Sequence, residues 1–115
     1  MANKTVYDLT YDSSVAASTT DIQLSPIVAS GKQVRVKKFG GLDPAIGDNI
    51  DSLIALQWGS GGSWAAVVVG SKQFQYEINK VFTGDGSKRF RIVRQNKSIV
   101  AKVIYAWVEA MVDDV

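Results

Sequence analysis

The chain has 115 residues, of which 46% are hydrophobic and 21% are charged, as expected of a soluble domain built around one core. Thirteen Lys and Arg residues against eleven Asp and Glu residues give a net charge of +2, which is too small to require a polyanionic partner such as a nucleic acid. The lack of Cys excludes disulfides and thiolate metal sites, and the lack of His removes the usual general base. The composition therefore disfavours an enzyme.

The first 20 residues are expected to form an N-terminal arm, or a first strand with a linker, ahead of a β-sandwich domain over residues 21–115. Residues 4–11 (K-T-V-Y-D-L-T-Y) alternate and are rich in Thr, Tyr and Val, which favours a strand or an extended arm. Residues 12–21 are small and polar and have no periodic apolar face, which is typical of a linker or loop. No secretory signal is evident in this segment, so we expect a soluble protein made in the cytoplasm.

The next part of the chain predicts strands separated by loops. Residues 22–27 form a short extended piece in which Pro26 marks an edge or a bend. In residues 32–39 (K-Q-V-R-V-K-K-F) the two valines face one way and the cations the other, which predicts a half-buried antiparallel strand. Residues 40–49 are dense in Gly, Asp and Pro and are expected to form a loop.

The strand pattern continues through the second half of the chain. Residues 53–58 and 63–69 are joined by G-S-G-G, which is a strong signal for a β-hairpin. Residues 73–82 alternate as a strand, a turn is expected at residues 83–87, and residues 88–95 form the next strand.

The last apolar segment, residues 99–112, is compatible with a helix or a strand. Its Ala and Glu content suits a helix, whereas its Val, Ile, Tyr and Trp content and its apolar residues on both faces favour a long strand buried on both sides. As a helix it is too short to cross a membrane. About eight short strands with Gly-rich turns predict an all-β fold, namely an antiparallel β-sandwich of jelly-roll type.

The stretch F-T-G-D-G-S-K-R-F-R-I-V-R-Q-N, residues 82–96, combines a Gly-rich loop with four cations. A phosphate-binding loop needs G-x-x-x-x-G-K-[ST] between a strand and a helix, whereas here Ser87 separates Gly86 from Lys88 and a strand follows. The D-G pair favours a hairpin turn instead.

The strand after this turn is expected to present cations on a surface. Alternation points Phe90 inward and leaves Arg89 and Arg91 outward, and Arg35 and Lys37 lie near them if the two strands pair. Such a face is compatible with a solvated strand that blocks edge aggregation, with a nucleic-acid site, or with contact to an acidic protein surface. The modest net charge and the inward aromatic ring disfavour nucleic acid.

Acidic residues offer two further candidate sites. One loop contains four oxygen ligands suited to Ca²⁺, although their spacing matches no EF-hand and such residues also form turns: Asp43, Asp48, Asn49 and Asp51. Glu77 and Glu109 are the only glutamates, and no motif supports them as a catalytic pair. We therefore expect no catalytic residues, no resident metal and no cofactor.

The aromatic residues divide between core and surface. Trp58 shares a face with Ile54 and Leu56, which predicts a core position. Trp64 and Tyr76 are the candidates for exposed rings on which a sugar stacks. A carbohydrate-binding or receptor-binding head is the alternative function that these two residues support.

Three stretches together suggest a family: K-Q-V-R-V-K-K-F-G-G, then F-T-G-D-G-S-K-R-F-R-I-V-R-Q-N after a hairpin, and A-W-V-E-A in the closing strand. In strand order and turn placement, over roughly residues 20–112, the chain resembles the small jelly-roll head decoration (cement) proteins of tailed bacteriophages. The resemblance implies a homotrimer on the surface of the phage head, in contact with the major capsid protein, that reinforces the head against internal DNA pressure.

The same resemblance implies where contacts would lie and offers no catalytic residues. An arm over residues 2–21 would reach neighbouring subunits by strand addition. The expected partner-contact residues are in this arm and on the basic strands: Tyr7, Leu9, Arg35, Lys37, Arg89 and Arg91. No membrane or nucleic-acid partner is expected.

Overall fold

The computed structural model describes residues 5–6, 9–43, 52–71 and 73–115, and within these ranges the protein is all-β. The described residues form no helix, so they include no helix that could cross a membrane. The strands run in the order β1 (Thr5–Val6), β2 (Leu9–Tyr11), β3 (Ser14–Val15), β4 (Thr20–Leu24), β5 (Lys32–Leu42), β6 (Leu53–Ser60), β7 (Ser63–Ser71), β8 (Gln73–Thr83), β9 (Arg89–Gln95), β10 (Lys102–Val103) and β11 (Tyr105–Asp114).

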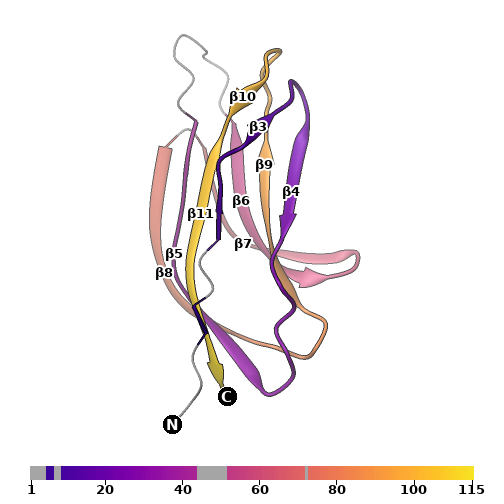
Figure 1. Ribbon diagram of the computed structural model, residues 1–115, viewed down its shortest axis with the longest axis vertical. Coiled ribbons are helices and arrows are strands. Elements are labelled where there is room, and N and C mark those ends of the chain that lie inside the picture. The colour runs from indigo at the N-terminus through magenta and orange to yellow at the C-terminus, as the bar shows by residue number, and fades with distance from the viewer. Residues whose placement is uncertain (1–4, 7–8, 44–51, 72) are drawn as a thin grey trace.

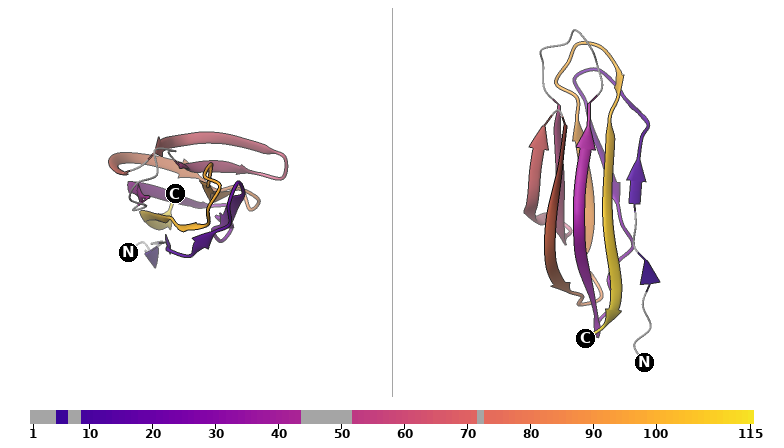
Figure 2. Two further views of the ribbon diagram at one scale, coloured as in Figure 1. Left: turned by 90° about the horizontal axis from the view of Figure 1, so that it is seen from above. Right: turned by 90° about the vertical axis from the view of Figure 1, so that its left-hand side faces the viewer.

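Two antiparallel sheets form a sandwich (Figure 1). The first, here called the β5 sheet, has the order β1-β11-β5-β8, and β2 also pairs with β11; the second, the β9 sheet, has the order β4-β9-β6-β7. The right-hand view of Figure 2 shows β8, β5 and β11 side by side. The short strands β3 and β10 form a separate pair at one end.

The strand order confirms the predicted jelly roll. Counting β1 and β2 as one strand and setting aside β3 and β10 leaves eight principal strands in the described chain. Their spatial order is first-eighth-third-sixth in the β5 sheet and second-seventh-fourth-fifth in the β9 sheet. Consecutive strands therefore alternate between the sheets along most of the chain, as two Greek keys wound into a jelly roll require.

The core lies between the two sheets, and a β-bulge sets the phase of β5. Val34 and Val36 are fully buried, as their alternation predicts, but Phe39 is also fully buried although it lies three residues after Val36. In the pairing of β5 with β11, Val36 lies opposite Ala110 and Lys38 opposite Glu109, so Lys37 is an extra residue in β5. The pairing of β5 with β8 also shifts here, where Asn79 adopts a left-handed backbone with φ of 49°. The extra residue Lys37 returns Phe39 to the core face.

Aromatic rings from both sheets pack together against the hydrophobic core. Trp58 of β6 lies 4.7 Å from Phe90 of β9 and 5.2 Å from Phe82 of β8, measured between ring centroids. Phe82 and Phe90 meet edge to face, also at 5.2 Å. Trp58 lies on the core side as predicted, but it is half-buried and packs against the buried core, and the cluster contacts both layers of the sandwich.

The linker expected over residues 12–21 is instead part of the fold. Val15 in β3 is 2% exposed and belongs to the hydrophobic core, and β4 already begins at Thr20. One large apolar residue among small and polar ones gives no periodic signal in the sequence. Its burial depends on the pairing of β3 with β10, which lies far away in the chain.

The last segment is a strand, as favoured, but it starts later than residue 99. Ile99 is 85% exposed and Val100 is 55% exposed, in a loop ahead of β10. The buried Asn96 side chain holds this loop, because its Nδ2 donates to the carbonyl oxygens of Val15 at 3.0 Å and Val100 at 2.9 Å. The second face of β11 is only half-buried, so the expectation of a strand buried on both sides was wrong.

The G-D-G turn does not close a hairpin, because β8 and β9 belong to different sheets. Gly86 has the positive φ, 85°, that such a turn requires. Asp85 Oδ1 accepts hydrogen bonds from the backbone N–H groups of Ser87 at 2.9 Å and Lys88 at 3.0 Å. These N–H groups are therefore already occupied, which removes the phosphate-binding alternative for this loop.

Candidate protein-interaction surface

A buried arginine organises the strand that carries the surface cations. In β9 the inward-facing positions are Phe90, Ile92 and Arg94, and Arg94 has no exposed surface. Its Nε and Nη2 donate to Asp21 Oδ2 at 3.1 and 2.7 Å, and Nη2 also donates to Ser13 Oγ at 2.8 Å. Its Nη1 donates to the carbonyl oxygens of Ser13 at 2.8 Å and Ile104 at 2.7 Å. All five guanidinium N–H groups thus have acceptors.

This network turns β4 so that its apolar side faces outward. Asp21 points toward Arg94, and Gln23 Nε2 donates to Asp21 at 3.1 Å, so the polar residues of β4 lie on the core side. Ile22 and Leu24 therefore lie on the opposite side, where they are 47% and 50% exposed. A strand normally buries its apolar face, so β4 has an inverted pattern.

The exposed residues of β4 continue into a surface across the β9 sheet. The strand register aligns one apolar row over all four strands: Ile22, Val93, Ala55 and Val69. Val69, at the far end of the row, is 48% exposed. Cross-strand partners lie on the same side of a sheet, so the row forms an apolar stripe on its outer face. Its exposed area is mainly at Ile22 and Val69, because Ala55 is 2% exposed and Val93 is half-buried. We call this the outer face of the β9 sheet.

Arg89 and Arg91 lie on this outer face, as alternation predicts. Arg91 pairs in register with Leu24 and Gln57, donates a hydrogen bond to the Gln57 side chain, and places its guanidinium 4.5 Å from the centre of the Trp64 ring. Arg89 Nε donates to the carbonyl oxygen of Ser25 at 2.9 Å. Both cations are held at fixed positions beside the apolar stripe, because each has a protein partner.

The charge on this face has one sign. The outward positions of the described strands β4, β9, β6 and β7 include the two arginines and no carboxylate: Thr20, Ile22, Leu24, Arg89, Arg91, Val93, Gln95, Leu53, Ala55, Gln57, Gly59, Trp64, Ala66, Val69 and Ser71. The face therefore combines an apolar stripe with two cations, a combination complementary to an apolar surface that carries acidic groups.

The other two expected cations lie elsewhere. Arg35 and Lys37 belong to β5, which pairs with β8 and β11 and not with β9, so they do not join Arg89 and Arg91. Arg35 lies opposite Val81 and Met111 in register and is exposed on the outside of the β5 sheet. The two basic strands thus present their cations on different sheets of the sandwich.

The remaining predicted residues are also separated from this surface. Tyr7 lies outside the described residues, while Leu9 in β2 pairs with Val108 of the same chain. Glu77 and Glu109 are exposed cross-strand neighbours of Lys38 on the β5 sheet. A cation therefore lies in register between the two glutamates.

Only one residue of the acidic loop lies within the described chain. Asp43 is 3% exposed, and its Oδ2 accepts from Lys102 Nζ at 2.8 Å and from Ser52 Oγ at 2.6 Å. The other three residues, 48, 49 and 51, lie outside the described residues. The carboxylate of Asp43 therefore neutralises a buried lysine, which is a structural function that the loop composition did not indicate.

The two aromatic candidates differ in their surroundings. Trp64 is half-buried, with Arg91 over its ring and its Nε1 donating to the Gly61 carbonyl oxygen at 2.7 Å. Tyr76 is 46% exposed and stacks on Phe74 at 5.2 Å between centroids. Tyr76 is therefore the more accessible of the two rings.

Sequence reasoning missed Ile22 and Leu24 as surface residues. Their alternation with Asp21 and Gln23 indicates a two-sided strand but does not tell which side faces the core. That choice follows from the burial of Arg94, whose acceptors come from three separate segments of the chain, at Ser13, Asp21 and Ile104.

No protein-family model and no curated protein sequence matches the chain. Among solved structures, one match is a chain in the structure of infectious bursal disease virus, Gx strain, with a TM-score of 0.53 and 11% identity over 98% of this chain. The present chain spans about a third, 32%, of that viral chain. The crystal structure of PirA matches with a TM-score of 0.40 and 13% identity, over 87% of this chain and 92% of that one. At these identities the viral match supports the fold alone.

Proposed function

We propose that this protein is a non-enzymatic structural component of a virion, a decoration protein that docks on the major capsid protein of a phage head through the outer face of the β9 sheet. The docking surface on the partner is apolar and carries acidic side chains. The protein acts by adding contacts between capsid subunits, so its work is mechanical.

The observation that carries this proposal is the inverted pattern of β4. Ile22 and Leu24 are about half exposed while Asp21 and Gln23 face inward. The strand therefore exposes its apolar side chains although its polar ones could have faced the solvent instead. Contiguous exposed apolar surface with a polar rim marks interaction sites in soluble proteins. Fold likeness to a chain of a virus structure and the resemblance to phage decoration proteins support a virion as the place of this interaction.

Charge decides the kind of partner. Arg89 and Arg91 adjoin the apolar row, and no carboxylate shares the described part of this face. A basic partner would be repelled, whereas acidic groups opposite the two arginines would steer docking and fix its register. The partner is therefore a protein surface that offers carboxylates next to apolar side chains.

The size of the face favours an oligomer. Four strands about 4.8 Å apart span ~15 Å between the outermost strand axes, and the seven-residue β9 is ~23 Å long. The face therefore covers roughly 350 Å², which is small beside the ~800 Å² that each partner contributes to a stable interface. A homotrimer would present three such faces and bind by avidity. Light scattering on the purified protein tests this part of the proposal, and a strict monomer at micromolar concentration contradicts it.

The docking proposal is tested with particles of the virus that encodes the chain, prepared without this protein. Purified wild-type protein is expected to co-sediment with the particles, and Arg91→Glu is expected to bind at least about ten-fold more weakly because it places like charges together. Arg35→Glu on the β5 sheet is the matched control and is expected to bind like wild type. Equal loss in both variants, or no binding by the wild type, contradicts the proposal.

A further inference from the structure

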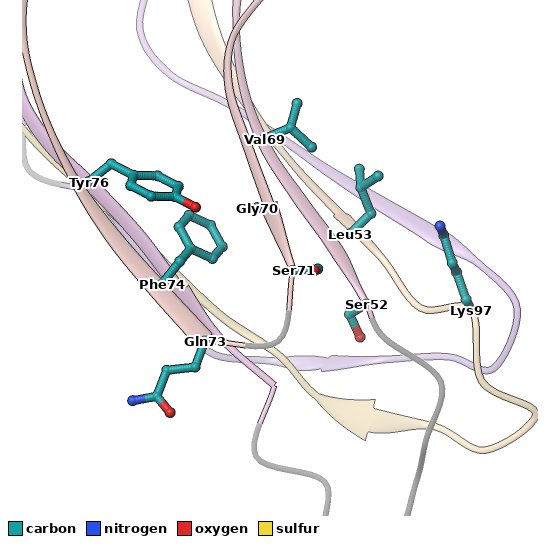
Figure 3. A pocket seen from close by; sticks show the side chains of 9 residues that line it. All are labelled: Ser52, Leu53, Val69, Gly70, Ser71, Gln73, Phe74, Tyr76 and Lys97. Atoms are coloured by element: carbon teal, nitrogen blue, oxygen red, sulfur yellow. The ribbon is translucent and has the colours of Figure 1, made fainter.

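A pocket of about 480 Å³ opens where β7 ends and β8 begins (Figure 3). It lies beside the Val69 end of the apolar row and is lined from three directions. Phe74 and Tyr76 come from β8, Leu53 and Val69 come from the paired strands β6 and β7, and Lys97 comes from the loop after β9. Its volume falls in the range of small-molecule sites.

One wall of the pocket is aromatic and held in place. The rings of Phe74 and Tyr76 stack at 5.2 Å with planes 30° apart. Gly70 lies directly against Phe74, because a Cβ atom there would come within 2.5 Å of that ring. One side of Phe74 is thus packed on the backbone, and Tyr76 extends the aromatic wall toward solvent, where it is 46% exposed.

Hydroxyl and amide groups that can exchange hydrogen bonds with a ligand lie beside this aromatic wall. Ser71 and Gln73 are exposed at its edge, and among the described residues their side chains form no hydrogen bond that would occupy them. Gln73 supplies both a donor and an acceptor, and Ser71 supplies a hydroxyl group. Ser52 also lines the pocket, but its hydroxyl already donates to Asp43.

Lys97 contributes the one full charge among the described lining residues. It lies across the pocket from Tyr76, beyond Leu53, and is exposed (Figure 3). The pocket therefore combines an aromatic platform on one side, hydroxyl and amide groups at the rim, and a cation on the other side.

We propose that this pocket binds an acidic saccharide, that is, a sugar ring that carries a carboxylate. The apolar C–H face of the ring packs on Tyr76, its hydroxyl groups exchange hydrogen bonds with Ser71 and Gln73, and its carboxylate faces Lys97. A purely apolar ligand would leave these polar groups without partners, and a small anion would make no use of the aromatic wall. The pocket shares Leu53, Val69 and Ser71 with the outer face of the β9 sheet but includes neither Arg91 nor β4, so saccharide binding by the free protein is tested independently of docking.

The test is a saccharide array that contains neutral sugars and their uronic acid counterparts, probed with the full-length protein. Wild type is expected to retain acidic saccharides, with glucuronate-type sugars bound about two- to five-fold more strongly than the matched glucose-type sugars. Tyr76→Ala is expected to lose about five-fold or more for both classes. Lys97→Gln is expected to lose only the preference for the acid, and Lys88→Gln, an exposed lysine in a distant turn, is the matched control.

Three outcomes overturn the proposal. The first is that the wild type retains no acidic saccharide. The second is that Lys97→Gln keeps the full preference for acidic sugars, and the third is that a folded Tyr76→Ala variant binds like the wild type. Thermal unfolding checks the fold of the Tyr76 variant; Lys97 is an exposed loop residue whose replacement leaves the fold intact, so its result stands even if Tyr76→Ala unfolds.

Discussion

At the residue scale, the buried side chain of Arg94 connects distant parts of the chain. It connects β9 to Ser13, to Asp21 at the start of β4, and to Ile104 ahead of β11. A buried arginine is tolerated only where its donors are satisfied, and here every one has an acceptor. The orientation of β4, and with it the exposed apolar pair, depends on this residue.

Replacing Arg94 is expected to destabilise the protein strongly. Arg94→Met leaves the Asp21 carboxylate without its cation and two carbonyl oxygens without their donor, and removing one partner of a buried ion pair costs about 3–5 kcal/mol. The free energy of unfolding from urea denaturation measures the loss. Arg35→Gln, at an exposed position, is the control and should change stability by no more than about 0.5 kcal/mol.

A double variant tests the network itself. Arg94→Met combined with Asp21→Asn is expected to cost clearly less than the sum of the two single variants, because each single change already breaks the same pair. Strict additivity would show that Arg94 acts independently of Asp21 and would remove the explanation given for the orientation of β4.

At the scale of elements, the turn between β8 and β9 depends on Asp85. Hydrogen bonds from the backbone N–H and hydroxyl of Ser87 and from the N–H of Lys88 lower the pKa of the Asp85 carboxyl below its ordinary value of 3.8. Because the folded pKa lies below the unfolded one, the ionised carboxylate stabilises the folded state above the unfolded pKa. That contribution disappears as the pH falls through the folded pKa.

The turn therefore makes a pH-dependent prediction. Wild type is expected to be more stable than Asp85→Asn near pH 6, and the difference should narrow as the pH falls below about 4. Urea denaturation at a series of pH values measures both proteins. The Asn side chain keeps an acceptor oxygen but has no charge, so a difference that stays constant with pH would refute the role of ionisation.

The N-terminal segment makes a second prediction at this scale. Deleting residues 1–8 removes β1 from a sheet edge and is expected to change stability by no more than about 1 kcal/mol. Deleting residues 1–20 also removes Ser13 and the buried Val15, and is expected to cost at least about 3 kcal/mol. Equal denaturation midpoints for the two truncated proteins would show that residues 9–20 are a dispensable arm.

At the scale of the whole molecule, alternation and turn chemistry predicted the fold because they are local. The valines of β5, the G-S-G-G hairpin and Phe90 lie as expected, since each follows from the period of a strand or from a Gly-rich turn. Phe39 and Gly40 did not follow this rule. A bulge changes the phase at Phe39, and Gly40 remains in β5 because the ring of Trp107 occupies the space of a side chain there.

The candidate surface was only partly predictable. Arg89 and Arg91 lie outward as strand alternation predicts. Arg35 and Lys37 would join them only if the two strands paired, and the jelly-roll order separates β5 from β9. Ile22 and Leu24 were missed because the direction of β4 depends on contacts more than 70 residues apart, such as that between Arg94 and Asp21. Such contacts leave no periodic trace in the sequence.

The measurement that most directly tests the docking face is hydroxyl-radical footprinting of the protein free and bound to capsid particles. Docking through the outer face of the β9 sheet predicts that oxidation of Ile22 and Leu24 falls on binding, while Val81, 38% exposed on the β5 sheet, is oxidised as before. Protection of Val81 with unchanged oxidation of Ile22 and Leu24 would contradict the proposed docking face.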